Sequence, residues 1–428
     1  MTAEGDGCRA VIRDPLLRTV VAELAPGRFD RLGVAVSGGG DSVALLHLLA
    51  AWRAAAGPDL APDLLAVTVD HGLRPDAAAE AAAVARTCAG LGVPHRVLRW
   101  QGWDGRGNLQ DAARRARQRL IADWAAGQGL PAVALGHTAD DQAETVLLRL
   151  ARGSGVDGLA GMAARRQVEG LLWLRPLLGL RRAELRDWLR ARGVGWAEDP
   201  SNEDMRFDRV KARRALAVLA PLGIDAAGLL DTAARMRMAR DALAEAAQAA
   251  ARALARIDGG DVLLAAGYAG LPEETRLRIA AHALRWIGGG AYRPRLAALR
   301  GALASAAAGK PATLAGCLLL PEKGGLRIAR EPQAVAGTRA APGALWDGRW
   351  RLHGPGPEGC EVRALGPAGL ALCPDWRGWG RPRAALAATP AVWRGGDLVA
   401  APLAGRPGGW TAELACGEED FVLSLILD

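Results

Sequence analysis

The chain has 428 residues, 50% of them hydrophobic, which is enough for two or three domains with sizeable cores. It has no run of about 18 apolar residues, which excludes an ordinary membrane span, and its first residues do not resemble a signal peptide, so a cytoplasmic protein is expected. The net charge of +8 permits a polyanionic partner such as RNA but does not prove one.

Strand-like and helix-like segments alternate from Arg31 to about Trp196. The strand candidates are "LGVAVSG", "LLAVTVDH", "HRVLRW" and "PAVALGH", and each is followed by a segment with helical periodicity. The alternation predicts the α/β class, with a doubly wound, Rossmann-like parallel sheet covered by helices on both faces. Ligands of such sheets bind at the carboxyl ends of the strands, and the unusual polar clusters of this chain follow strand candidates.

The sequence changes character after about residue 215. The alanine-rich segment 225–256 and the segments 271–288 and 292–309 predict helices. The remaining chain is rich in glycine and proline, with short apolar runs and several tryptophans, which predicts a small, β-rich domain. We therefore expect three domains: a catalytic domain at 1–217, a helical domain at 218–330 and a C-terminal domain at 331–428.

The first polar cluster, "SGGGDS", joins a strand candidate to a helix. Glycines let the backbone approach a phosphate, and the helix start offers free N–H groups and the positive end of the helix dipole. A Walker A loop needs a lysine that is missing here, so backbone groups would bind the phosphate. The alternative is a tight turn in which a side chain caps the helix. The residues of this phosphate loop are Ser37, Gly38, Gly39, Gly40, Asp41 and Ser42.

The same loop resembles the signature of the PP-loop ATP pyrophosphatases, which cleave ATP between its α- and β-phosphates. The resemblance implies that the loop holds the pyrophosphate, that a substrate oxygen becomes adenylated, and that Asp41 positions Mg²⁺ or the phosphates. The end of the second strand, Asp70 and His71, would then lie near the adenosine. The alternative is that these two side chains only finish the strand and begin a turn.

A further cluster, "GHTADDQAET", follows the fourth strand candidate. Asp140, Asp141 and Glu144 fall within the first helical turns, where acidic side chains also stabilise a helix start. Three carboxylates and His137 at a sheet edge near a phosphate loop favour Mg²⁺ binding and recognition of an amine. A structural role for His137 is supported about equally. Gly136, at the same strand end, is expected to contact the nucleotide.

Two arginine-rich segments are candidates for binding phosphates. Arg114 and Arg117 are three residues apart, so they share one helical face and could contact ATP or a phosphodiester. Arg206 and Arg209 lie in a basic stretch after the polar turn "EDPSN" at 198–202. For this second stretch, an amphipathic connector to the helical domain is an equally supported alternative.

Taken together, the motifs resemble the tRNA(Ile)-lysidine synthetase family. "SGGGDS", "VDHGLR", "GHTADDQAETVLLRLARGSGVDGLAGM", "RPLL" and "EDPSN" occur in the order of that family, over about residues 30–215. A weaker resemblance continues through "LPEETRLRIAAHALRWIG" and "ATLAGCLLL". The sequence departs from the family at Val210, where asparagine is frequent, so a side-chain hydrogen bond from this position is not expected.

The resemblance implies a two-step reaction with ATP, Mg²⁺, free lysine and a tRNA(Ile) with a CAU anticodon. The C2 oxygen of the wobble cytidine 34 attacks the α-phosphate, and the lysine ε-amine then displaces AMP. The phosphate loop, Arg114 and Asp141 would stabilise the charge of the first step, with Asp41 and Asp141 as Mg²⁺ ligands. His137, Asp140, Asp141 or Glu144 would take the proton of the amine, and Asp140, Glu144, Arg117, Arg206 and Arg209 would bind lysine or tRNA.

Other functions remain open from the sequence. Enzymes that thiolate tRNA generally need paired cysteines, but the six cysteines of this chain form no CxxC pair. Enzymes that use glutamine need a glutaminase, and no nucleophilic-cysteine elbow is evident. An amine taken directly from solution fits these absences. The alternatives are another PP-loop adenylating tRNA ligase and a non-catalytic module that binds tRNA or a nucleotide. The chain is expected to bind no membrane, and a homodimer is compatible with the sequence.

Overall fold

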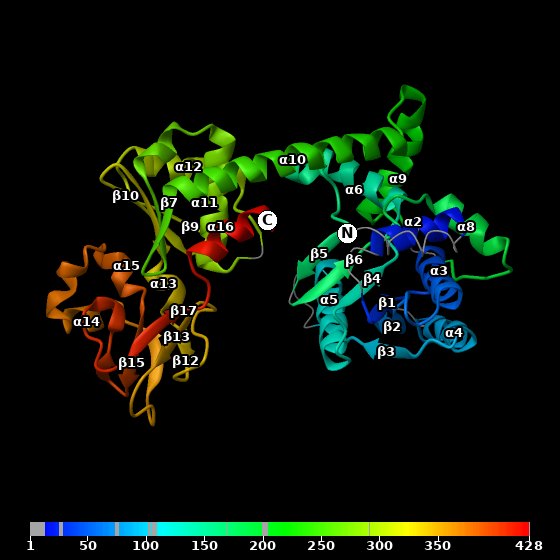
Figure 1. The fold of residues 1–428 in the computed structure, drawn as a ribbon. Coiled ribbons are helices and arrows are strands. Elements are labelled where there is room, and N and C mark those ends of the chain that lie inside the picture. Colours follow the sequence, from blue (N-terminus) through cyan, green and yellow to red (C-terminus); the bar gives the residue numbers. More distant parts are fainter. Residues whose placement is uncertain are drawn as a thin grey trace. The chain divides into compact units, whose positions relative to one another are not determined.

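The computed structural model describes residues 13–24, 29–72, 77–101, 103, 109–168, 170–198, 204–290 and 292–427. Contacts divide the chain into two compact units, Met1–Met238 and Ala239–Asp428 (Figure 1). Among the described residues, no single helix is long and apolar enough to cross a membrane, while the bent pair Asp208–Leu222 and Ala226–Leu254 passes that test by length and composition only.

A six-stranded sheet with the order β3-β2-β1-β4-β6-β5 forms the centre of the first unit. Its neighbouring strands are parallel, except for the antiparallel pair of β5 and β6 at one edge. The predicted parallel sheet is therefore confirmed, and the pair of β5 and β6 is an addition to it. The strands are β1 (Arg31–Ala35), β2 (Asp63–Asp70), β3 (His95–Arg99), β4 (Ala132–Leu135), β5 (Arg165–Val168) and β6 (Leu171–Leu174).

Helices cover both faces of this sheet, as expected for a doubly wound fold (Figure 1). Alternate strand residues face opposite cores, so Ala132 and Ala134 join one cluster and Val133 joins the other. Each fully buried Val or Leu side chain contributes about 1.5–3 kcal/mol to such a core. The first cluster includes residues of α2 (Pro15–Leu24), α3 (Gly40–Ala56), α4 (Ala77–Gly90) and α8 (Arg182–Arg190), and the second includes residues of α5 (Leu109–Gly127).

The remaining helices of the first unit pack around α6. Ala143 and Val146 of α6 form a small core with Leu229 and Ala233 of α10. This packing fixes the position of α6, whose first turn carries the predicted acidic cluster. The helices are α6 (Ala139–Ala151), α7 (Val156–Leu159), α9 (Asp208–Leu219), the 3₁₀ helix η3 (Ala220–Leu222) and α10 (Ala226–Leu254), which contains the boundary between the two units.

The second unit begins with helices packed on a five-stranded antiparallel sheet of the order β7-β8-β11-β10-β9. Its helices confirm the predicted helical segments, whereas the sheet was not predicted. The elements are β7 (Ala255–Asp258), β8 (Asp261–Leu264), η4 (Ala266–Gly270), α11 (Glu273–Gly288), α12 (Leu296–Ala307), β9 (Ala312–Leu314), β10 (Cys317–Glu322) and β11 (Gly325–Arg330).

The last hundred residues form a four-stranded sheet, β12-β14-β15-β16, and a two-stranded sheet, β13-β17. A buried ion pair, 2.9 Å long, joins Arg381 of this region to Asp261 of β8. The elements are α13 (Pro332–Val335), β12 (Arg339–Ala340), β13 (Trp350–His353), β14 (Glu361–Ala364), α14 (Gly366–Ala371), η5 (Pro374–Trp379), α15 (Arg383–Ala387), β15 (Pro390–Arg394), β16 (Asp397–Ala400), η6 (Pro402–Ala404), β17 (Thr411–Leu414) and α16 (Glu418–Leu427).

Candidate active site

The strand order reverses between β1 and β4 at the centre of the first sheet. β1 continues to β2 on one side, while β4 lies on its other side and continues to β6. Ligands of doubly wound sheets bind at the carboxyl ends of the strands at this kind of reversal. The loop after β1 and the loop after β4 meet there very closely. A Cβ atom added to Gly136, which follows β4, would lie only 2.9 Å from the Cα atom of Ser42.

The phosphate loop is held in shape by its own serine. The Ser42 hydroxyl donates to the Gly39 carbonyl at 2.9 Å and accepts the Ser37 backbone N–H at 3.1 Å. Gly38 has a φ of +91°, a conformation that favours glycine. The backbone N–H of Ala197 donates to the Gly38 carbonyl at 3.0 Å, which fixes the loop from outside. At the start of α3 the N–H groups of Ser42 and Val43 donate to the Gly39 carbonyl at 3.1 Å. The N–H groups that precede them, together with the positive end of the helix dipole, are the candidates to bind an anion.

The acidic cluster begins with a capping box at the start of α6. Thr138 donates its backbone N–H to Asp141 Oδ2 at 2.9 Å and its hydroxyl to the same atom at 3.0 Å. The Asp141 N–H donates back to the Thr138 hydroxyl at 3.4 Å. One oxygen of Asp141, Oδ2, therefore accepts the hydrogen bonds that cap the start of α6, as anticipated for acidic residues in this turn. The other oxygen, Oδ1, faces the remaining side chains of the site.

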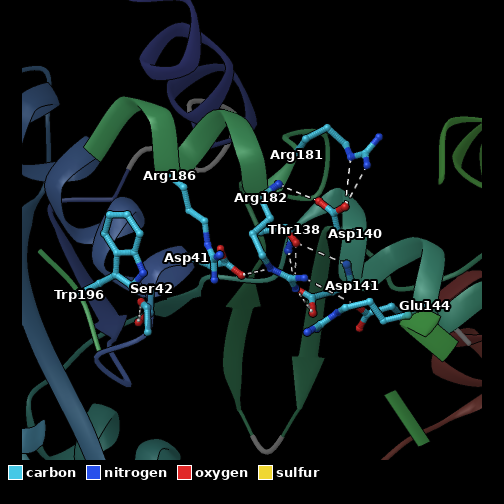
Figure 2. Close-up of polar contacts among 12 residues, drawn as sticks. Asp41, Ser42, Thr138, Asp140, Asp141, Glu144, Arg181, Arg182, Arg186 and Trp196 are labelled. Atoms are coloured by element: carbon cyan, nitrogen blue, oxygen red, sulfur yellow. Dashed lines mark hydrogen bonds and ion pairs between the residues drawn. The ribbon is translucent and has the colours of Figure 1, made fainter. Parts of the chain in front are cut away.

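Arg182, the first residue of α8, lies in the middle of the carboxylates and was not predicted (Figure 2). Its Nε donates to Asp41 Oδ2 at 2.9 Å and its Nη2 to Asp141 Oδ1 at 3.2 Å. Its Nη1 lies 3.6 Å from Glu144 Oε1, and its backbone N–H donates to Asp140 Oδ2 at 2.7 Å. The structure therefore brings the four predicted carboxylates together around one arginine.

Three further arginines surround this cluster. Arg181 pairs with Asp140 at 3.0 Å, Arg213 of α9 with Glu144 at 2.9 Å, and Arg209 lies 3.5 Å from Asp141. Arg209 is thus at the predicted site, whereas Arg181 was not predicted. Arg213 belongs to the basic stretch that was expected to contact phosphates, and its ion pair with Glu144 was not anticipated. Their sequence signal was only a high density of arginine, which a solvated helix face explains equally well.

The four carboxylates differ in acidity. Burial raises the pKa of Asp41, and Arg182 offsets this only in part. Burial likewise raises the pKa of Glu144 against the attraction of Arg213. For Asp140 and Asp141, burial is outweighed by hydrogen bonds and by the nearby arginines, so the pKa of each is lowered. The site thus combines two carboxylates whose pKa is lowered with two that bind a proton more readily than usual.

His137 is an uncharged imidazole at neutral pH. Burial lowers its pKa to about 3, because Asp141 opposes the effect only partly and Arg117 adds to it. The Nδ1 atom is buried without a hydrogen-bond partner among the described residues. The protonated ring would carry a positive charge away from solvent and near the positive charges of arginines, so the folded state disfavours the protonated form.

We expect a His137→Gln variant to lose stability less steeply than the wild type as the pH falls from 6.5 toward 3. In the wild type the unfolded chain binds a proton on this histidine and the folded chain does not, so its contribution is fully present above pH 6.5 and lost toward pH 3. Between pH 3 and pH 6.5 the free energy of unfolding, measured with urea, should change with pH more steeply in the wild type than in the variant, by on the order of 1 kcal/mol per pH unit. The control is His353→Gln, an exposed position on β13, which should follow the wild type. Parallel curves for His137→Gln and the wild type would contradict the buried neutral ring.

The other predicted residues divide into two groups. Arg117 lies within electrostatic range of the site, since its charge lowers the pKa of both His71 and His137, and Arg114 acts in turn on Arg117. Arg206 is exposed and pairs with Asp204 at 2.7 Å. Within the described part of the chain, its ion pair is with Asp204 and not with the acidic cluster.

The structure also places residues of two further motifs. Asp70 accepts the Gly72 N–H at 2.8 Å, which is a contact within the turn that follows β2. Val210, where the sequence departs from the family, is a buried residue of α9. The residues at 73–76 and 199–202, which complete the motifs "VDHGLRPD" and "EDPSN", lie outside the described residues.

Asp41 is the residue that best fits a magnesium ion. Its Oδ1 atom is buried and has no hydrogen-bond partner among the described residues, while Oδ2 is held by Arg182. Both oxygens of Asp141 are already engaged, by Thr138 and by Arg182. In the described part of the chain no three His, Cys, Asp or Glu side chains are grouped as a metal site. Asp41 Oδ1 could therefore serve as one carboxylate ligand of an Mg²⁺ ion that is otherwise held by substrate phosphates.

Comparison with known proteins first defines the class. The family model described as a PP-loop domain matches residues 15–219, which include the phosphate loop and the acidic cluster. A U34-tRNA thiolase of Methanococcus maripaludis aligns with a TM-score of 0.45 and 16% identity, over 52% of this chain and 78% of that one. By the family model, residues 15–219 of the first unit are a PP-loop domain, the class of domain with which PP-loop enzymes use ATP.

Two curated relatives define the family. The tRNA(Ile)-lysidine synthase of Ruegeria pomeroyi is 58% identical over 397 residues, which cover 92% of this chain and 94% of that protein. The enzyme of the same name from Methylobacterium nodulans is 45% identical over 343 residues, 78% of this chain and 99% of that protein. The chain belongs to the tRNA(Ile)-lysidine synthase family.

Proposed function

We propose that the protein joins lysine to C2 of cytidine 34 in a tRNA(Ile) with a CAU anticodon, using ATP and releasing AMP and pyrophosphate. The product, lysidine, pairs with A, so the tRNA reads AUA instead of AUG. The observation that carries the proposal is the meeting of a lysine-free phosphate loop with buried carboxylates at one sheet edge, in a member of this family.

In the first step, the C2 oxygen bonds to the α-phosphorus of ATP while the bond to the β-phosphate breaks. The backbone N–H groups at the start of α3 bind the departing pyrophosphate, and Arg114 and Arg117 supply positive charge from α5. A magnesium ion bound at Asp41 would neutralise phosphate charge as it develops. Asp70, His71 and Gly136 border the same sheet edge and are assigned to the nucleotide.

The lysine enters a cavity at the acidic cluster. This cavity has a volume of about 320 Å³ and is lined by Asp140, Glu144, Arg181, Arg182 and Arg213, with apolar walls from α9 and α10. Pockets for small molecules typically have volumes of about 300–1,000 Å³. The carboxylates suit an ammonium group, Arg181 and Arg213 suit an α-carboxylate, and the apolar wall suits the methylene chain.

Glu144 is the preferred group to take the proton of the lysine amine. Its Oε2 atom is buried without a partner among the described residues, and burial raises its pKa. His137, with a pKa of about 3, is a much weaker base. A free lysine amine has a pKa of about 10.4, so the bound ammonium must give up its proton before it can attack. Asp140 and Asp141, whose pKa values are lowered, serve as fixed charges.

The tRNA is held by arginines near the site and by the second unit. Arg117, Arg206 and Arg209 are assigned to phosphodiesters around the target base, which must leave its stack to reach the ATP. The helical domain at 218–330 and the C-terminal domain at 331–428 would bind the rest of the tRNA. A tRNA-modifying enzyme acts where tRNA is used, so we place the protein in the cytoplasm. A homodimer remains a prediction from the sequence.

Incubation with ATP, Mg²⁺, labelled lysine and tRNA(Ile) with a CAU anticodon should label the tRNA. The same tRNA(Ile) with guanosine in place of cytidine 34, and a reaction without ATP, should stay unlabelled. Missing label beside an active reference enzyme would contradict the proposal. Release of pyrophosphate with other tRNAs would instead indicate a different PP-loop ligase. Binding of ATP or tRNA without turnover would indicate a non-catalytic module.

A further inference from the structure

One side chain, that of Arg182, is shared by two parts of the site. Its three guanidinium nitrogens each face a different carboxylate: Asp41 at 2.9 Å, Asp141 at 3.2 Å and Glu144 at 3.6 Å. The side chain is 19% exposed, so it is largely shielded from solvent. The whole guanidinium group is therefore engaged by side chains of the site (Figure 2).

The three carboxylates belong to different binding regions. Asp41 lies in the first turn of α3, within the phosphate loop. Glu144 lines the cavity assigned to lysine, and Asp141 stands between the two regions on α6. Arg182 also lines this cavity, so it fills the place that a substrate ammonium would take beside Glu144.

We propose that Arg182 is a positioning residue that couples nucleotide binding to lysine binding. Without nucleotide it neutralises Asp141 and Glu144 and thereby competes with the lysine ammonium. The negative phosphates of a bound nucleotide draw the guanidinium toward the phosphate loop. Asp141 and Glu144 then lose one internal cation, and the ammonium of lysine takes its place. This inference rests on the proposed function, because it takes lysine as the occupant of the cavity.

The remaining contacts allow this exchange. When Arg182 moves away, Glu144 keeps Arg213 at 2.9 Å and Asp141 keeps its bonds to Thr138. Neither buried carboxylate is left without a partner, so the movement requires no unpaired charge in the protein. Binding coupling is reciprocal, so lysine must also tighten nucleotide binding by the same factor.

A purely structural role for Arg182 makes a different prediction. If Arg182 only held α3, α6 and α8 together, it would contribute to the stability of the fold. Its replacement would then weaken the binding of both nucleotide and lysine without changing the effect of one ligand on the affinity for the other. The coupling between the ligands therefore separates the two roles, since a loss of stability alone does not alter it.

The test measures the dissociation constant of labelled lysine for the full chain, with and without Mg²⁺ and the uncleavable analogue α,β-methylene-ATP. In the wild type the analogue should tighten lysine binding about tenfold, within the range of about 5- to 150-fold that is typical of coupled sites. In Arg182→Gln lysine should bind without nucleotide at least as tightly as in the wild type, and the analogue should change its affinity less than twofold. Arg190→Gln, on the exposed side of α8 where Arg190 pairs with Asp187, should keep the tenfold effect.

Each other outcome has a definite meaning. A tenfold effect that persists in Arg182→Gln, or no effect in the wild type, overturns the coupling. If Arg182→Gln does not fold, Arg182→Lys replaces it; a lysine side chain cannot span three carboxylates, so the coupling must be smaller than in the wild type. An unchanged effect in that variant also overturns the proposal. If the wild type binds the analogue but lysine under no condition, it is the proposed function that fails.

Discussion

A Gly136→Ala variant will lose adenylation activity by about 100-fold while its first unit stays folded. The added Cβ would lie 2.9 Å from the Cα and 3.0 Å from the N of Ser42, and 3.1 Å from the carbonyl carbon of Asp41. All three atoms are backbone in the first turn of α3, so no side chain can turn away. The end of β4 and the start of α3 must separate, and small misplacements of reacting groups reduce rates by about 10²-fold.

The measurement is tRNA-dependent release of pyrophosphate, together with thermal unfolding. Overpacking of this kind costs about 1–3 kcal/mol, which a domain with two extensive cores should tolerate. The matched control is Gly127→Ala, because Gly127 ends α5 and its added Cβ meets nothing within 4 Å. This control should keep full activity. A folded Gly136→Ala variant with the wild-type rate would show that the contact between the two loops is not needed.

The meeting of these loops was predictable because it depends only on strand order and on local patterns. Apolar strand candidates, glycines after the first and an acidic helix start after the fourth are all visible in the sequence. Parallel strands then carry their carboxyl ends to one edge. The double role of Asp141 was also foreseeable, since acidic residues near a helix start are common caps. For these parts of the site, local chemistry and topology gave the same answer.

Arg182 could not be selected in the same way. The chain has 54 lysine and arginine residues, and "LRRAELRDWLR" reads as one more amphipathic helix. What distinguishes Arg182 is that the start of α8 faces the start of α6, where its N–H meets Asp140 and its guanidinium meets Asp41. That approach is set by packing between segments about 40 and 140 residues apart, as the separations of these bonds show.

The antiparallel sheet of the second unit was missed for a related reason. Its strands have three to six residues, too few for a clear alternation of apolar and polar side chains. β8 pairs with β11, about sixty positions later, with two helices between them. Helix α10, by contrast, followed the predicted range closely, because an alanine-rich segment has a strong helix preference of its own.

An Asp41→Asn variant will fold normally and lose about 10²- to 10³-fold in the rate of pyrophosphate release. The amide keeps the shape of the side chain but removes its negative charge, and with it the proposed magnesium ligand and one partner of Arg182. Removal of one preorganised charge contact to a transition state typically has an effect of this size. The fold should tolerate the change, because burial already raises the pKa of Asp41 and a neutral group there avoids the desolvation of a charge.

Single-turnover release of pyrophosphate in the absence of lysine is the decisive measurement, since it isolates the step before the amine attacks. Asp123→Asn, at an exposed position of α5, is the matched control and should react as the wild type does. If Asp41→Asn formed the adenylated tRNA at the normal rate but failed to accept lysine, Asp41 would belong to the amine site instead. Such a result would transfer the charge stabilisation of the first step to the backbone N–H groups of α3 and to the arginines of α5.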